Sequence, residues 1–119
     1  MKREIVDYIE DIIGAMDKAS SFVESMNYDE FVRDVKTVYA VIRAIEIIGE
    51  AVKNIPEDVR KNYPEIPWKN IAGMRDKVIH AYFGVNLERI WQVIQKDIPV
   101  LKPEFEKVLM DMQTQSDMG

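Results

Sequence analysis

The sequence of 119 residues contains no cysteine, which excludes disulfide bonds, thiolate nucleophiles and cysteine metal ligands. It contains a single histidine, so zinc sites that need two or more histidines are also excluded. The five glycines are isolated, and no glycine-rich loop is available to cradle a phosphate. No apolar run approaches the roughly 18 residues of a membrane span, and the charged start at Lys2, Arg3 and Glu4 does not match a signal peptide. We therefore expect a cytoplasmic protein that uses no metal or cofactor.

Positive charge is also scarce. The formal net charge is −5 and the pI is about 4.9, which argues against indiscriminate binding to nucleic acid, because such binding needs many phosphate contacts from lysine and arginine. The charge is unevenly spread: residues 1–50 carry a net −5, residues 51–77 a net +2 and residues 78–119 a net −2. The one basic segment leads into the histidine, although so small an excess also suits an ordinary solvated surface.

Apolar residues at alternating spacings of three and four predict two long amphipathic helices in the first half of the chain. The first is expected over residues 3–25, with the stripe Ile5, Ile9, Ile12, Met16, Ala19 and Val23. The second is expected over residues 29–54 as the longest helix, with the stripe Phe31, Val35, Val38, Ile42, Ile45, Gly49 and Val52. Further apolar residues widen this second stripe beyond one face, so one side can face the core and the other a partner subunit.

Prolines and glycine divide the second half of the chain. After a short helix, a longer one is expected from about 67 to 82, ended by Gly84. Asn86 is expected to cap the last helix, which Pro99 and Pro103 kink or restart.

No stretch alternates as a strand does, and no internal repeat or low-complexity linker is present. The sequence therefore predicts an all-α bundle of four to five helices. We expect residues 1–119 to form a single domain, with the polar end at 113–119 frayed.

The only histidine lies in the stretch 75–86, together with an arginine, an aspartate and a tyrosine. On a helix, Arg75 and Tyr82 share nearly one face, whereas His80 points about 140° away from Arg75. A bend or a second copy of the helix is therefore needed to bring Arg75 and His80 together. Asp76 lies one turn before His80 and can hold the imidazole in one tautomer and favour its charged form.

A histidine that moves protons beside an arginine that binds phosphate suits RNA cleavage, in which the 2′-hydroxyl is a built-in nucleophile. His80 would act as base, and Arg75 would stabilise charge that grows on the phosphorus-bound oxygens. The residues alone leave an alternative open, because a lone histidine near a helix end is more often a surface residue or a hydrogen-bonded core residue.

The order of three segments is more specific than the histidine. Residues 40–51 contain Ile-Gly-Glu-Ala, residues 67–75 lead into Arg75, and residues 79–85 complete an Arg-x4-His-x-Tyr signature, followed by Trp91. This combination resembles HepT-like toxins, a branch of the HEPN superfamily of small helical ribonucleases. One departure is Asp76, since the superfamily often has asparagine directly after the catalytic arginine; the acid can weaken RNA binding without implying inactivation.

The resemblance implies a HEPN-type bundle that dimerises through the long second helix and the signature helix. Two signature helices would then meet at a shared cleft with Arg75 and His80 as catalytic residues and Asp76 in support. It further implies a metal-independent endoribonuclease toxin acting on RNA, with tRNA as one candidate. Its partner would be an MntA-like nucleotidyltransferase antitoxin that silences it by AMPylation of Tyr82, as in type VII toxin–antitoxin modules. The alternatives are a catalytically inactive HEPN module that scaffolds the nucleotidyltransferase, and a purely structural helical dimer.

Overall fold

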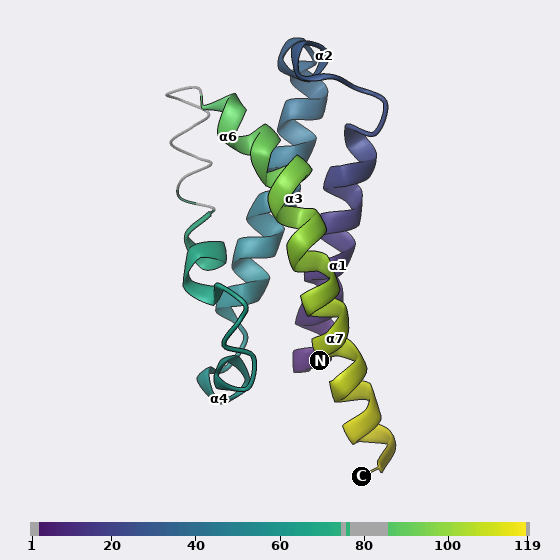
Figure 1. Cartoon of the computed structure of the whole chain (residues 1–119), viewed down its shortest axis with the longest axis vertical. Helices are drawn as coiled ribbons and strands as arrows, with labels where there is room; N and C mark the ends of the chain where they lie inside the picture. Colours follow the sequence, from purple (N-terminus) through teal and green to yellow (C-terminus); the bar gives the residue numbers. More distant parts are fainter. Residues whose placement is uncertain (1–2, 75, 77–85, 119) are drawn as a thin grey trace.

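The computed structural model describes residues 3–74, 76 and 86–118, and this part of the chain is helical without any β-strand (Figure 1). Three long helices form the body: α1 (Ile5–Phe22), α3 (Val35–Lys53) and α7 (Ile98–Met118). α1 packs against both α3 and α7, so it lies at the centre of the bundle's contacts. The expected all-α bundle is confirmed. α7 includes residues 113–118, and their fraying stays a prediction about dynamics.

The core forms where the expected apolar stripes meet. The stripe of α1 is confirmed, because five of its six members are at most 2% exposed and Ile5 packs against them half-buried. α3 contributes Val41, Ile45 and Ile48, each fully buried, and α7 contributes Phe105 and Val108, also fully buried. No polar or charged residue is buried in the part of the chain that the structure describes. The core is therefore held by apolar burial, at roughly 25 cal/mol per Å² of buried surface.

The single second helix predicted over 29–54 is wrong. A short helix α2 (Tyr28–Arg33) ends at Asp34, which has an extended backbone and begins α3. The Asp34 carboxylate accepts a hydrogen bond from the backbone N–H of Thr37 at 3.1 Å, an N-cap that the apolar spacing did not reveal. As a result Val35, predicted in the buried stripe, is 64% exposed, and α7 is longer than α3.

The last helical part of the chain, residues 87–118, changes from an α-helix to a π-helix just before Pro99. α6 (Leu87–Gln92) is followed by one π-helical turn (Val93–Asp97) and then by α7. The Ile98 N–H bonds the carbonyl of Val93, five residues back. A proline clashes with the carbonyl four residues before it, and the wider π turn makes room for Pro99. The predicted interruption is thus a change of helix type at Pro99, while Pro103 lies inside α7.

The connector between α3 and residue 68 is held by polar contacts to the end of α3 and to α7. It contains the short helix α4 (Glu57–Lys61), as expected. Arg60 donates to two carbonyls at the end of α3, those of Val52 at 2.8 Å and Ile55 at 3.0 Å. The Tyr63 hydroxyl donates to Asp111 on α7 at 2.8 Å. Burial, followed by the hydrogen bond to Asp111 and its negative charge, raises the pKa of Tyr63 to about 12.

Replacing the cap of α3 should destabilise the fold. Asp34→Ala leaves the Thr37 N–H without its acceptor, and we expect a loss of about 1 kcal/mol in the free energy of unfolding, measured by urea denaturation. Asp34→Asn keeps an acceptor oxygen and serves as the control. Equal urea midpoints for the alanine variant and the wild type would show that the cap contributes nothing.

The link between Tyr63 and Asp111 should be visible in an alkaline titration. The folded pKa is raised above the usual 10.0, so the stabilisation is fully present below pH 10 and is lost as the pH rises towards 12. Phenolate absorbance should include one group near pH 12 that Tyr63→Phe removes. Asp111→Asn should lower that midpoint only partway towards 10.0, because burial remains the larger cause. An unchanged midpoint in Asp111→Asn would contradict the assigned hydrogen bond.

Candidate functional site

Three of the four predicted site residues, Arg75, His80 and Tyr82, lie outside the described residues. Their proposed roles therefore stay predictions. The fourth, Asp76, is described: it is helical and exposed. What the structure adds is the framework on either side of this segment, which determines where the chain enters it and where it leaves.

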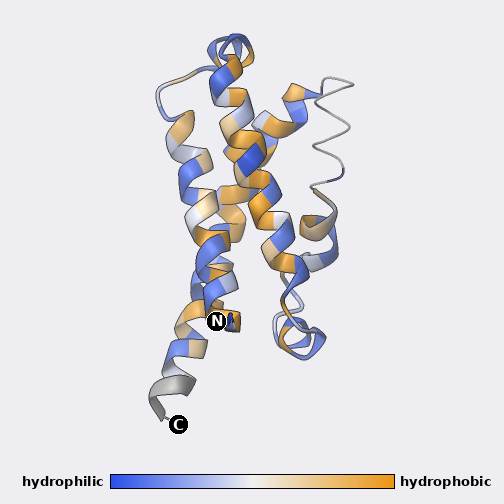
Figure 2. Ribbon diagram, turned by 180° about the vertical axis from the view of Figure 1, so that it is seen from behind, coloured by the Kyte–Doolittle hydropathy of each residue, from blue (hydrophilic) through white to orange (hydrophobic). Residues whose placement is uncertain are grey.

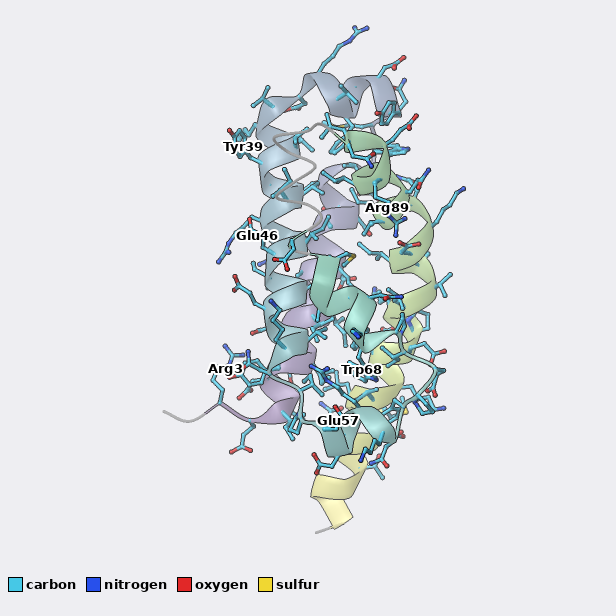
Figure 3. All side chains as sticks on the ribbon, turned by 90° about the vertical axis from the view of Figure 1, so that its left-hand side faces the viewer. Arg3, Tyr39, Glu46, Glu57, Trp68 and Arg89 are labelled. Atoms are coloured by element: carbon cyan, nitrogen blue, oxygen red, sulfur yellow. The ribbon has the colours of Figure 1, made fainter. Side chains whose placement is uncertain are left out.

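The chain enters the segment from a helix that spans residues 68–74 and is anchored by Trp68. This side chain is only 7% exposed and lies between its own helix and α7 (Figure 3). Its ring meets Phe105 edge-on, with centroids 5.5 Å apart and planes at 90°. The indole N–H donates to the carbonyl of Tyr63 at 3.0 Å, which satisfies the polar atom of a buried tryptophan. Ile71, one turn on, is 2% exposed and completes the anchor.

The chain leaves the segment at an equally well-defined point. Asn86 caps α6 as predicted, since its side chain accepts a hydrogen bond from the backbone N–H of Arg89 at 3.1 Å. Trp91 then packs against α2, with its ring 5.3 Å from Phe31 and 6.0 Å from Tyr28. Aromatic pairs at these separations contribute about 0.5–1.5 kcal/mol beyond their buried area.

The end of the entry helix has an open side. A Cβ atom added to Gly73 would meet nothing within 4 Å, and Asp76, three residues later, is exposed. An exposed carboxylate suits either of the roles predicted for Asp76, orienting an imidazole or opposing an approaching phosphate. The exposure of Asp76 is compatible with both roles and does not favour either one.

A second hollow surface was missed by the sequence reasoning. A groove of about 730 Å³ runs between α1 and α3, and its lining includes Gly14, Ala40 and Ala44. The signal for it was present in the sequence as small residues on the outward sides of two amphipathic helices. It could be recognised only after the two helices were known to lie side by side.

The described residues were compared with two further kinds of feature, a metal-binding cluster and a membrane-spanning helix. No group of three or more histidine, cysteine, aspartate or glutamate side chains is gathered there in a way that could hold a metal ion. Among these same residues, no helix is both long enough and apolar enough to cross a membrane.

Comparison with known proteins gives a consistent result. Residues 12–108 match the model of the family described as "Ribonuclease HepT-like". "Probable ribonuclease HepT" from Thermococcus cleftensis is 52% identical over 108 residues, which cover 91% of this chain and 98% of the relative. "Putative RNase MJ0125" from Methanocaldococcus jannaschii is 48% identical over 112 residues, or 94% and 97% of the two chains. No solved structure matches the chain at a significant level.

The family match extends from α1 into α7, so it covers the helices of the core as well as the segment with the histidine. The helical bundle, the anchored entry helix and the capped exit helix form one continuous framework within this matched region. On these grounds, the chain belongs to the HepT-like family of HEPN-type ribonucleases.

Proposed function

We propose that the protein is a metal-independent endoribonuclease that cleaves RNA through Arg75 and His80. The observation that carries this proposal is the family match over residues 12–108, which includes the whole stretch 75–86 with its arginine, histidine and tyrosine in signature order. RNA is the proposed substrate, with tRNA as one candidate. The anchored helices on both sides of the stretch support the proposal, because a catalytic segment needs fixed ends to hold reacting groups in place.

The proposed reaction is an internal transesterification. His80 accepts the proton of the 2′-hydroxyl, and the 2′-oxygen attacks the adjacent phosphorus. Arg75 stabilises the negative charge that builds on the phosphoryl oxygens. The bond to the 5′-oxygen breaks, and a second imidazolium returns a proton to that leaving oxygen. The products are a 2′,3′-cyclic phosphate and a 5′-hydroxyl, and Asp76 orients the imidazole in this scheme.

The second imidazole is proposed to come from a second copy of the chain. On one helix, His80 points about 140° from Arg75, so two signature helices that meet at a shared cleft would complete the site. The wide apolar surface of residues 31–52 that suggested this dimer is largely packed within the chain. Val35 and Tyr39 are the large apolar residues of α3 that remain exposed, at 64% and 54%.

The enzyme is further proposed to act in the cytoplasm as the toxin of a type VII-like toxin–antitoxin module. An MntA-like nucleotidyltransferase would serve as the antitoxin and attach AMP to Tyr82. Arg75 and Tyr82 share a helix face in the sequence pattern, so each added phosphodiester would bring negative charge to the anion site. This would oppose binding of the RNA backbone.

A second candidate function is a non-catalytic HEPN module that only binds the nucleotidyltransferase. The observation that favours it is electrostatic: the chain carries a net charge of −5, and Asp76 is exposed directly after Arg75. Negative charge near the phosphate site weakens RNA binding. A cleavage assay with purified protein separates the two candidates.

Cleavage of RNA should continue in EDTA, should leave a 2′,3′-cyclic phosphate and should spare DNA, which lacks the 2′-hydroxyl. Arg75→Ala and His80→Ala should each lower the rate at least ~100-fold, the lower range for removing a positioned acid–base group. Circular dichroism should remain helical in both variants. Cleavage by His80→Ala at the wild-type rate would refute the proposed chemistry.

Incubation with a cognate nucleotidyltransferase and ATP should add AMP to Tyr82 and inhibit cleavage. Tyr82→Phe keeps the aromatic ring but lacks the acceptor oxygen, so it should fold normally and escape silencing. Intact mass spectrometry measures the adduct. A Tyr82→Phe variant modified to the same yield as the wild type would place the acceptor elsewhere.

A further inference from the structure

Glu46 is a half-buried acid in the middle of α3, with its side chain 23% exposed. It shares one stripe of the helix with Ile42, four residues before it, and Gly49, three residues after it. Ile42 is 8% exposed and Gly49 is buried, so this stripe is covered on both sides of the glutamate. Withdrawing a carboxylate from water is costly, and a cationic partner on the same side of α3 would offset that cost.

The stripe with Glu46 does not face α1. The side of α3 that lines the groove towards α1 carries Ala40, Ala44, Ile47 and Ala51. At about 100° per residue, these positions fall on nearly the opposite side of the helix from Ile42, Glu46 and Gly49. Figures 1 and 2 show α3 between α1 on one side and the entry helix of residues 68–74 on the other. Figure 3 looks onto the side of the entry helix and shows Glu46 at the height where that helix ends.

The ion pair between Glu46 and Arg43 does not account for this position. The two charged groups are 4.0 Å apart on the same helix, and the Arg43 side chain is 62% exposed. Exposed pairs of this kind contribute little stability. Arg43 also lines the groove on the α1 side of the helix, away from Ile42 and Gly49. A cation on the side of the entry helix would match the half-buried carboxylate better.

The entry helix has a buried side and an exposed side, and the sequence assigns Arg75 to the buried one. Trp68 and Ile71 are buried, whereas Lys69 and Asp76 are exposed. Arg75 follows Trp68 by seven residues and Ile71 by four, which are the spacings that return to one face of a helix. In the helical repeat, Arg75 therefore belongs to the side that faces the bundle, and Lys69 to the side that faces solvent.

We propose that Glu46 is a positioning residue that binds the guanidinium of Arg75 and orients it towards the phosphate to be cleaved. This inference rests on the proposed function, since Glu46 would act through Arg75. Neighbouring helices pack about 8–10 Å apart, a gap that a glutamate and an arginine side chain bridge together. A carboxylate in a paired contact takes two of the five N–H donors of a guanidinium, which leaves three for the phosphoryl oxygens.

Glu46 would act by orientation and not by its charge. A long arginine side chain has many rotamers, and a planar contact with a carboxylate selects among them before RNA binds. The negative charge by itself opposes binding of the RNA backbone. Loss of orientation and loss of charge therefore affect different kinetic constants. The first lowers kcat, and the second leaves KM unchanged or lowers it.

Glu46→Gln keeps the size of the side chain and removes the charge. We expect kcat for RNA cleavage to fall by ~10- to ~100-fold, since a misplacement of about 1 Å costs as much as the larger factor, while KM stays unchanged or falls. Glu46→Asp keeps the carboxylate on a shorter stem and should recover part of kcat. Glu106→Gln, at an exposed position of α7, is the matched control and should cleave at the wild-type rate. In the Arg75→Ala background, Glu46→Gln should cause no further loss, because two residues that act as one unit are not additive.

The contact can also be measured without catalysis. The N–H resonances of the Arg75 guanidinium in a proton–nitrogen NMR spectrum are assigned by their absence from Arg75→Ala. In the wild type they should exchange slowly with water, because these protons are donated to a carboxylate. Glu46→Gln should move the resonances and speed their exchange, and Glu106→Gln should leave both unchanged.

A wild-type kcat in Glu46→Gln overturns the inference and leaves the proposed function standing. A further loss in the Arg75→Ala background also overturns it, because Glu46 would then act independently of the arginine. A lower kcat with a lower melting temperature and unmoved Arg75 resonances would assign Glu46 a structural role only. A protein that cleaves no RNA refutes the proposed function, and the resonances then decide the contact by themselves. They also decide it if Arg75→Ala has no measurable rate.

Discussion

The packing of α1 against α3 is the contact on which the rest of the molecule depends. Ile9 and Ile12 on α1 and Ile45 and Ile48 on α3 are all fully buried, with no buried polar group among the described residues to compete with them. Truncating such a side chain to alanine typically costs 2–5 kcal/mol, a large part of the stability of a small domain. α7 packs against α1 in turn, and Phe105 on α7 contacts Trp68, so the entry helix is attached to the same body.

The second constraint is the way in which the helices on either side of residues 75–85, the stretch proposed to be catalytic, are attached to this body. Its entry is held by Trp68 and by the connector contact between Tyr63 and Asp111, whose residues are 48 positions apart in the chain. Its exit is held by the Asn86 cap and by Trp91. The two anchors lie against different helices, since Trp68 contacts Phe105 on α7 and Trp91 contacts Phe31 on α2.

Charge is distributed unevenly over the protein. The chain is acidic overall, yet residues 51–77 are net positive and end at the proposed phosphate-binding Arg75. The α1/α3 face is nearly balanced, with acids at one end and bases at the other. If the proposed function holds, this distribution opposes binding of RNA along the whole surface, because such binding needs many contacts between phosphates and basic side chains.

The sequence by itself determined the helical class, the buried stripe of α1, the Asn86 cap and the family, because each depends on local periodicity, capping chemistry or motif order. It did not reveal the break at Asp34. A single capping residue interrupts a helix without disturbing the apolar spacing, so the pattern continues from Phe31 to Val38 while the backbone turns.

Only the tertiary structure decided the contacts between distant parts of the chain. Three such contacts are the hydrogen bond from Tyr63 to Asp111, the edge-on packing of Trp68 against Phe105, and the groove between α1 and α3. Each joins residues that are far apart in the sequence, so no local pattern predicts it. The charges of the groove illustrate the difference. Glu10, Lys18 and Arg43 look like ordinary surface residues in the sequence, and they line one groove only because two antiparallel helices bring them together.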